Sequence, residues 1–303
     1  MKLSKQKGEQ LQKMKKIITL FALILSLTLS AFMLTACEAG FSAEKNITIV
    51  TREPGSGTRS AFMEIIGLKG KTDVANAVVS GSTAGVLQEV KNNPHAIGYD
   101  SLGYVTDDVK ILKVDGITPT VASIKDGSYA ISRPLSIVYK AETIADGAAK
   151  AFYEFLTSKT AQDIVASEGY AGLDATSEYV ATPSLSGTIK VSGSTSLEPL
   201  MKVLADKFES LQPNVNVTVS GGGSGQGLSD AENSVSTFGM ISKKFKQEDA
   251  PSCTFTSVAY DGIAVIVNKE NPLDNITSEQ LKNIYDKDAA DKQITSWKAL
   301  INE

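Results

Sequence analysis

Short apolar runs alternate with amphipathic stretches from residue 46 onward. The runs are typical of buried strands, whereas apolar residues recurring every three or four positions indicate helices with one buried face. Strands are expected at 47–50, 76–80, 96–105, 135–140, 187–193, 214–220 and 257–268. Helices are expected at 57–66, 83–90, 149–169 (as one helix or two), 194–211, 224–231 and 277–287. This alternation favours an α/β fold in which helices cover parallel sheets.

One helical stripe and one polar segment add to this picture. The stripe consists of Leu197, Leu200, Val203, Leu204 and Phe208. Its helical spacing predicts core packing and no chemical role. Residues 173–187 are polar and have no clear period, so they predict a linker or a strap along the surface.

The N-terminus has the pattern of a secretory signal. Lys13, Lys15 and Lys16 precede the apolar residues 17–34, and small residues follow before Cys37. The ending Leu-Thr-Ala-Cys resembles a bacterial lipobox, which predicts a lipoprotein signal peptide at 1–36, lipidation of Cys37 and a tether at 37–45. The mature chain would then lie on the outer face of the cell membrane. An uncleaved membrane anchor is the alternative.

Charge and residue counts exclude several functions. Removing residues 1–36 would remove six lysines and one glutamate and would take the formal net charge from −4 to −9. No basic block follows the N-terminus, so nucleic acid is not an expected partner. His95 is the only histidine, and Cys253 reads as a buried, unreactive thiol. No metal site and no cofactor are therefore expected, and an acidic domain that binds an anion must use local dipoles.

Glycine and hydroxyl residues occur wherever a predicted strand meets a predicted helix. They form four turns, at Ser56-Gly57-Thr58, Ser82-Thr83, Thr195-Ser196 and Ser224. The free N–H groups of a helix start bind oxyanions, and hydroxyl groups add donors. The first turn is not a nucleotide-binding P-loop, which requires a lysine after its last glycine. Ordinary helix capping explains any one such turn, and only several converging turns indicate a site.

Arg52 is the candidate charged clamp of this site. It lies two residues after the first predicted strand and just before the Ser56-Gly57-Thr58 turn. A guanidinium is permanently charged and can hold an oxyanion with two parallel hydrogen bonds. The alternative is an ion pair with Glu53 or Glu64 at the surface.

These residues also resemble a known family. The resemblance is carried by "TREPGSGTRSAF", "GSTSLEPLMKVLADKF", "VTVSGGGSGQG", "FGMIS" and "DGIAVIVN". Together they are similar to the phosphate-binding receptors of bacterial phosphate ABC transporters. This resemblance implies a two-lobed type II periplasmic-binding-protein fold that closes over one dehydrated phosphate and delivers it to a permease driven by an ATPase. It also implies phosphate contacts from Arg52, Ser56, Gly57, Thr58, Thr195, Ser196, Ser224 and Ser242.

Ser242 departs from the pattern of this resemblance. Some members of the family carry an aspartate there, and an acidic acceptor favours phosphate, which retains a proton, over fully deprotonated sulfate. Asp261 could supply the missing acceptor, or it could be a residue of a strand end or hinge. The sequence therefore predicts that an oxyanion binds, but it defines less clearly which tetrahedral oxyanion is preferred.

The order of the segments differs from the order in that family. The segment containing Arg52 is expected late in the chain but lies at its start, which predicts a circular permutation. One lobe would comprise 46–131 and 265–303, and the other 132–264 with the linker 173–187. A truncated tandem gene and a dimer that exchanges halves are alternatives to a permuted monomer.

Three classes of function remain in view. The resemblance favours a phosphate receptor with ABC permease subunits as partners. A phosphate or oxyanion sensor without a transporter is the second class. An exported phosphatase is the third, and it is disfavoured because the sequence offers neither a metal cluster nor an activated nucleophile.

Overall fold

The computed structural model describes residues 40–182 and 184–301. The expected signal peptide 1–36 and the lipidation site Cys37 lie outside this part of the chain. The description below concerns the compact unit from Ser42 onward.

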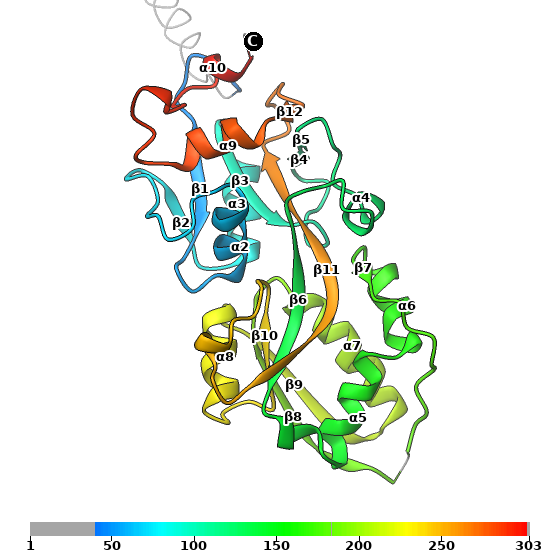
Figure 1. Cartoon of the computed structure of the whole chain (residues 1–303). Coiled ribbons are helices and arrows are strands. Elements are labelled where there is room, and N and C mark those ends of the chain that lie inside the picture. Colours follow the sequence, from blue (N-terminus) through cyan, green and yellow to red (C-terminus); the bar gives the residue numbers. More distant parts are fainter. Residues whose placement is uncertain (1–39, 183, 302–303) are drawn as a thin grey trace, which may run out of the picture. The chain divides into compact units, whose positions relative to one another are not determined.

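A ten-stranded sheet connects two lobes (Figure 1). Its main path runs β2-β1-β3-β11-β6-β10-β8-β9, and β4 and β7 pair with β11 outside this path. The strands are β1 (Thr48–Arg52), β2 (Val78–Ser80), β3 (Ala96–Ser101), β4 (Lys110–Ile111), β5 (Lys113–Val114), β6 (Ser132–Tyr139), β7 (Ala171–Gly172), β8 (Ser186–Gly193), β9 (Asn214–Gly221), β10 (Phe238–Ile241), β11 (Thr254–Val267) and β12 (Asn275–Ile276). The short strands β5 and β12 pair in a separate parallel ribbon.

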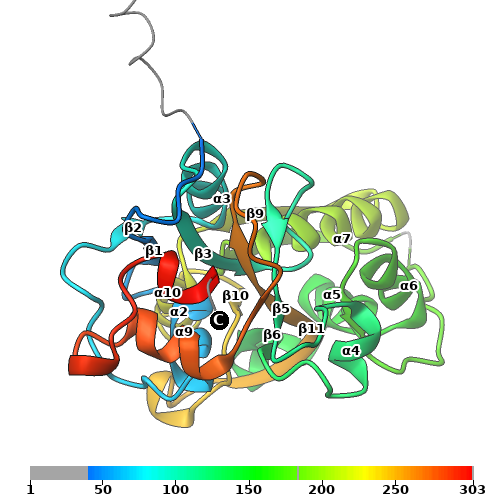
Figure 2. The ribbon, with the colours of Figure 1, turned by 90° about the horizontal axis from the view of Figure 1, so that it is seen from above.

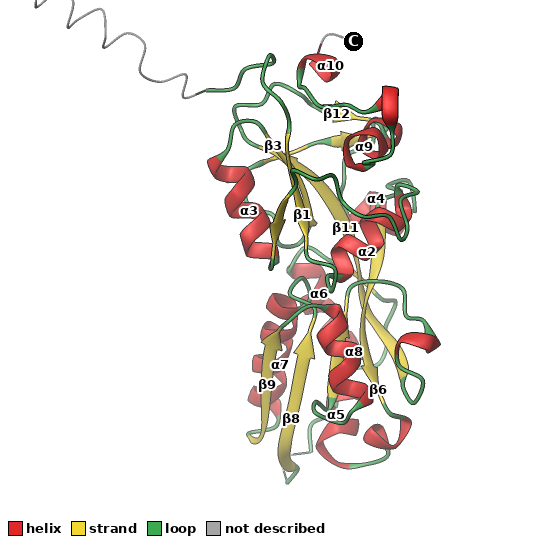
Figure 3. Ribbon diagram, turned by 90° about the vertical axis from the view of Figure 1, so that its left-hand side faces the viewer, coloured by secondary structure: helices red, strands yellow, loops and turns green. Residues whose placement is uncertain are grey.

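In each lobe, helices cover both faces of the sheet (Figure 3). The α-helices are α2 (Gly57–Ile65), α3 (Thr83–Asn92), α4 (Val121–Lys125), α5 (Gly147–Leu156), α6 (Lys159–Ser167), α7 (Glu198–Leu211), α8 (Ser224–Glu232), α9 (Ser278–Tyr285) and α10 (Lys298–Ile301). The 3-10 helices are η1 (Ala141–Ile144), η2 (Gln247–Asp249) and η3 (Ala290–Lys292). In the first lobe, α2 and α3 lie on opposite sides of β1 and β3, and in the second lobe α7 and α8 lie on opposite sides of β8.

Two strands cross between the lobes. β6 runs from the first lobe into the second, and β11 returns, so the two strands pair antiparallel. β11 pairs with β6 up to Gly262 and with β3 from Ile263 onward. The sequence predicts parallel sheets, and the lobes do contain parallel pairs such as β1–β3 and β8–β9. The sheet as a whole is mixed because a returning strand must run against its neighbour.

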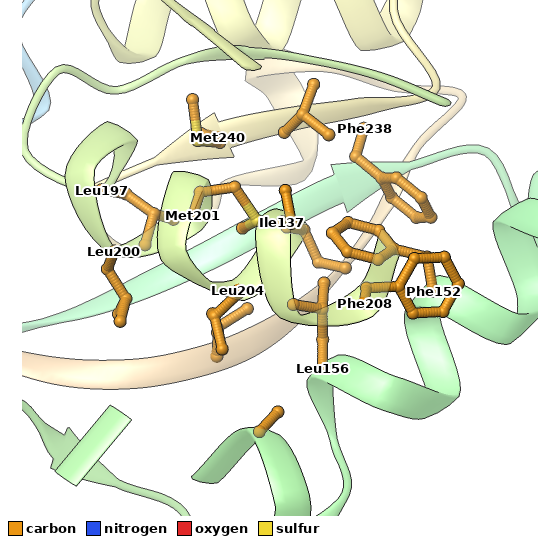
Figure 4. Packing of buried hydrophobic residues seen from close by; sticks show 14 of the residues in the cluster. Ile137, Phe152, Leu156, Leu197, Leu200, Met201, Leu204, Phe208, Phe238 and Met240 are labelled. Carbon is orange, nitrogen blue, oxygen red and sulfur yellow. The ribbon is translucent and has the colours of Figure 1, made fainter. Parts of the chain in front are cut away.

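A hydrophobic core lies in the second lobe, between its sheet and the helices α5, α6 and α7 (Figure 4). Leu197, Leu200, Leu204 and Phe208 are buried there, as the helical stripe predicts. Val203 is an exception, because 38% of its surface is exposed. The apolar burial of this lobe holds the starts of α7 and α8 in fixed positions relative to their strands.

The early and late segments of the described chain lie side by side. Ile47 N donates to Thr295 O at 2.8 Å, and Asn46 bridges Ser296 in antiparallel fashion. In the view from above (Figure 2), the late helices α9 and α10 lie over the same lobe as the early strand β1. The first lobe is therefore built from both ends of the described sequence.

Candidate functional site

Hydroxyl groups from both lobes meet at the predicted turns. Thr58 Oγ1 lies 2.8 Å from Ser196 Oγ. Thr83 Oγ1 lies 3.0 Å from Thr195 Oγ1 and 3.3 Å from Ser196 Oγ. Thr58 and Thr83 come from the first lobe, whereas Thr195 and Ser196 come from the second. Except for the half-buried Thr195, these side chains are buried, so the turns converge as the sequence analysis requires of an anion site.

Arg52 lies beside this hydroxyl cluster and is only 1% exposed. Its Nη1 donates to Thr83 Oγ1 at 3.3 Å, and its Nη2 donates to Thr195 Oγ1 at 3.1 Å. Its Nε and Nη2 also donate to the Glu53 carboxylate at 3.0 and 2.9 Å. The alternative of an ion pair with Glu53 is therefore realised, but the guanidinium is buried among the turns and does not lie at the surface. Glu53 fixes one edge of the guanidinium, and the remaining donors face the hydroxyl cluster.

A second group of hydroxyls faces the start of α2. Ser224 Oγ accepts from Ser242 N at 3.0 Å and lies 3.3 Å from Ser242 Oγ. A Cβ atom on Gly57 would lie 2.6 Å from Ser242 Oγ and closer still to Ser224 Oγ. A glycine at this position therefore permits the close approach of the two lobes.

The backbone also joins the lobes at this point. Gly225 N donates to Gly55 O at 3.0 Å, just inside the first turn of α8. The preceding Gly223 has φ +90°, a left-handed conformation that glycine adopts without strain. The "SGGGSGQG" turn thus lies against the "REPGSGT" turn, and both belong to one site.

Ser56 and Ser82 have a local structural role. Ser56 is the N-cap of α2 and its hydroxyl accepts from Arg59 N at 3.2 Å. Ser82 is the N-cap of α3 and accepts from Gly85 N at 3.1 Å. Neither hydroxyl has a described contact with the other lobe. These two serines therefore fit the ordinary capping explanation, while Thr58 and Thr83 beside them face the site.

Asp261 lies in a buried ion pair and not among the hydroxyls. Its Oδ2 accepts from Arg133 Nη2 at 3.0 Å, and both side chains are 1% exposed. Burial raises the pKa of the Asp261 carboxyl above its ordinary value, although Arg133 acts in the opposite direction. Arg133 Nη1 donates to Ser242 O at 3.2 Å, so the pair supports the backbone of the site from the crossing strands. Asp261 and Arg133 thus lie opposite one another on the two strands that cross between the lobes.

Sequence reasoning missed Asp100. It lies in β3 and is fully buried, and burial raises the pKa of its carboxyl well above the ordinary value. Arg52 is the charge that opposes this rise in pKa most strongly. The signal in the sequence was an acid within the apolar run "AIGYDSLGYV", where a solvent-exposed face is not expected.

Further properties limit what the site can do. Within residues 40–182 and 184–301, no group of three or more His, Cys, Asp or Glu side chains is arranged to hold a metal ion. In the same part of the chain, no helix has the length and apolar character needed to cross a bilayer. The described cluster offers hydroxyl and guanidinium donors and helix starts, which together suit an oxyanion.

Two α/β lobes joined by crossing strands, with polar groups of both lobes facing one another, define a ligand-binding receptor of the periplasmic-binding-protein class. The chain belongs to this family, since the model of the PBP superfamily domain matches residues 12–160 and 180–303. The particular relatives are phosphate-binding proteins. Phosphate-binding protein PstS 2 of Streptococcus agalactiae is 36% identical over 298 residues, which cover 95% of this chain and 99% of that protein.

Structural similarity agrees with the sequence match. The crystal structure of a phosphate-binding protein of a phosphate ABC transporter from Streptococcus pneumoniae TIGR4 is 33% identical and has a TM-score of 0.66. The match covers 84% of this chain and 99% of that one. Phosphate-binding protein PstS of Bacillus subtilis is 35% identical, but over only 129 residues, or 42% of each chain.

Proposed function

We propose that this chain is an extracytoplasmic substrate-binding lipoprotein that captures inorganic phosphate between its lobes and delivers it to an ABC transporter permease. The observation that carries the proposal is the meeting of Arg52 with Thr58, Thr83, Thr195 and Ser196 from two lobes. The phosphate-binding names of the relatives support phosphate as the anion.

The net charge of the protein is negative and repels an anion, so local groups of the binding site must provide the attraction. Arg52 supplies a fixed positive charge, and the starts of α2 and α8 supply backbone N–H groups and the positive ends of helix dipoles. The hydroxyls of Thr58, Thr195, Ser196, Ser224 and Ser242 supply further donors. Phosphate would replace the contacts that these groups make with one another, and the closed form would be the one that the permease recognises.

Calorimetric titration of the purified chain tests the proposal. We expect phosphate to bind with one site per chain and micromolar or tighter affinity, on the order of −8 kcal/mol or better. Absence of phosphate binding by a folded chain would refute it. Phosphate binding combined with normal phosphate uptake in a deletion strain would indicate a sensor, and release of phosphate from an ester substrate would indicate a phosphatase.

We further propose that the two halves of the chain are circularly permuted relative to relatives such as the Bacillus subtilis protein. One alignment spanning nearly all of both chains requires the same segment order in the streptococcal relative, whereas the Bacillus subtilis match ends at 129 residues. The bond from Ile47 N to Thr295 O supports the proposal, because a short connection could join these ends. The change of partner on β11 after Gly262 supports lobes of 46–131 plus 265–303 and 132–264.

A rearranged chain tests the permutation. Joining residue 301 to residue 46 through a short linker and opening the chain between 173 and 187 should preserve folding and phosphate affinity. The matched control opens the chain within α7, which should abolish folding. Loss of folding in both chains would contradict the permutation. Light scattering of the unaltered chain should give a monomer, and a dimer would support exchange of halves between two copies.

The N-terminus is proposed to anchor the protein through lipid on Cys37, with 37–45 as the tether. Mass spectrometry of the membrane-extracted protein should detect a diacylglyceryl group on Cys37 and no residues before it. An unmodified N-terminus that includes residues 1–36 would support an uncleaved membrane anchor instead.

A further inference from the structure

A separate cavity lies between the lobes, beside α2. It has a volume of about 740 Å³ and is lined from the first lobe by α2 and the loop 69–72. From the other side it is lined by residues 132–134 of β6, by Tyr260 of β11 and by the loop 243–249 after β10. None of the residues proposed to bind phosphate lines this cavity. We call it the α2 cavity, and its volume falls in the range of about 300–1,000 Å³ that is typical of small-molecule sites.

The charge of the cavity walls is opposite to that of the whole chain. Five lysines and two arginines line the cavity, against the two acids Glu64 and Asp249. The complete sequence, in contrast, has 34 acidic residues and 30 lysines and arginines. A cluster of cations in a concave site concentrates anions there, even when the net charge of the protein repels them.

The acidic partners of some of these cations lie outside the cavity lining. Arg59 pairs with Asp73 at 2.8 Å, and Lys71 pairs with Asp286 at 3.2 Å. Both cations line the cavity, whereas neither of the two acids does. The wall therefore presents the positive member of each pair to a ligand.

Lysines of the second lobe act on α2 across the cavity. Lys69 Nζ lies 3.0 Å from Glu64 Oε1, and both side chains are exposed. Lys69 lowers the pKa of Glu64 most strongly, and Lys246 and Lys244 of the second lobe act in the same direction. Exposed pairs of this kind are weak, so an incoming anion can compete with Glu64 for the three lysines.

Apolar and aromatic groups complete the cavity. Ala61 and Met63 of α2 are buried, whereas Ile65 is 38% exposed and Tyr260 is 46% exposed. An exposed phenol ring beside aliphatic side chains offers a surface on which a flat organic group can pack. Inorganic phosphate has no such group, so the lining favours an anion that is joined to an organic carrier.

We propose that the α2 cavity binds a soluble organic phosphate, namely a phosphate ester with an aromatic or apolar carrier group. Lys69 of the first lobe and Lys244 and Lys246 of the second hold the phosphate oxygens as charged donors. Tyr260 and Ile65 pack against the carrier group. This site is additional to the one between the helix starts, and its existence does not depend on the proposed function.

The position of the cavity predicts coupling to the phosphate site. Its walls come from both lobes, so the ligand favours the arrangement in which α2 and the loop 243–249 face one another. Phosphate is proposed to hold the lobes together in the same arrangement. The two ligands should therefore raise each other's affinity by the same factor, about 5-fold or more. This coupling, unlike the site itself, rests on the proposed function.

Calorimetric titration of the full chain, purified in detergent, with adenosine monophosphate tests the site. With inorganic phosphate saturating, one adenosine monophosphate should bind per chain in the micromolar range. Lys244→Gln/Lys246→Gln should weaken this binding by ~10-fold or more, because two charged donors are lost, and should leave the affinity for inorganic phosphate alone unchanged. The control Lys190→Gln/Lys207→Gln removes the same charge from exposed positions of the second lobe outside the cavity and should have no effect.

Tyr260→Ser tests the contact with the carrier group. With inorganic phosphate saturating, it should weaken binding of adenosine monophosphate by ~5-fold and leave binding of inorganic pyrophosphate unchanged. The reason is that pyrophosphate has the charge but no organic carrier. Equal weakening of both anions would refute the assignment of an organic phosphate.

Each remaining outcome decides one point. Displacement of adenosine monophosphate by inorganic phosphate would assign both anions to one site and overturn the proposal, as would absence of binding at millimolar concentration or equal effects of the two lysine pairs. If the Lys244→Gln/Lys246→Gln chain does not fold, Lys69→Gln takes its place, and unchanged binding in that variant refutes the site. Independent affinities of the two ligands would refute the coupling alone. Failure to bind inorganic phosphate would refute the proposed function, while the titration with adenosine monophosphate would still test the cavity.

Discussion

The guanidinium of Arg52 donates from Nη2 to Thr195 Oγ1 at 3.1 Å and so joins two residues that are 143 positions apart. Arg52 ends β1 in the first lobe, and Thr195 lies just before α7 in the second. Both residues of this hydrogen bond are proposed to bind phosphate. The bond brings a charged donor of one lobe and a hydroxyl group of the other to one location.

Replacing Arg52 by alanine should weaken phosphate binding by about 2–5 kcal/mol, because the anion and the buried hydroxyls lose a charged partner. Calorimetry at constant ionic strength measures the change. Arg59→Ala is the matched control, since Arg59 is a nearby arginine whose side chain is paired with Asp73. Equal effects of both substitutions would show that Arg52 acts only through net charge.

Gly57→Ala should prevent full closure of the lobes. The added Cβ would lie 2.6 Å from Ser242 Oγ, within a contact made by buried side chains of the opposite lobe. We expect phosphate affinity to fall by at least about 2 kcal/mol. X-ray scattering should show a larger radius of gyration with phosphate present than for the original chain. Gly55→Ala serves as the control because its Cβ would have no atom within 4 Å, and an equal loss there would contradict the steric explanation.

Thr195→Val tests a single hydroxyl of the site. The substitution keeps the shape of the side chain but removes the oxygen that contacts Arg52 and Thr83. We expect a loss of about 1–3 kcal/mol in phosphate binding because a buried donor loses its partner. Thr218→Val, whose hydroxyl donates only to Ile189 O at 3.4 Å, is the comparison. Unchanged affinity in Thr195→Val would exclude this hydroxyl from the site.

The buried pair of Arg133 and Asp261 should be sensitive to removal of one partner. Arg133→Met leaves the Asp261 carboxylate buried without its cation, and we expect the free energy of unfolding to fall by about 3–5 kcal/mol. Urea denaturation measures this. The double variant Arg133→Met/Asp261→Leu should recover most of the loss, because no uncompensated charge remains. A double variant as unstable as the single one would show that the pair is needed for packing around the crossing strands.

Asp100 should make stability depend on pH. Burial raises its pKa above the ordinary 3.8, so the folded chain holds a proton that the unfolded chain has released. Stability therefore falls as pH rises from about 4 until the folded carboxyl ionises. Asp100→Asn removes this contribution, so its thermal midpoint should exceed that of the original chain at neutral pH. Midpoints measured without phosphate from about pH 5 to about pH 8 test this, and a lower midpoint for Asp100→Asn would contradict it.

The local parts of the site could be predicted from the sequence. Ser56-Gly57-Thr58, Ser82-Thr83 and Ser224 all lie at helix starts, because strand–turn–helix units have short-range signals of apolar period, glycine and hydroxyl residues. The expected helix at 194–211 begins at Glu198, and Thr195 and Ser196 lie in the turn before it. The Gly-Ser-Thr-Ser motif thus identified Thr195 and Ser196 as site residues, although the predicted start of the helix was about one turn too early.

The sequence by itself determined most of the strands and helices, although not β10 or α4. It also determined which turns carry donors and that Arg52 lies close to the end of the first strand. Tertiary structure decided which donors face one another. Sheet register puts Asp100 beside Arg52, Arg133 engages Asp261, and Ser56 and Ser82 cap their own helices while Thr58 and Thr83 meet the other lobe. The physical reason is that helix starts follow from neighbouring residues, whereas burial and partners follow from contacts between residues that are far apart in the sequence, by 47 positions for Arg52 and Tyr99 and by 138 for Thr58 and Ser196.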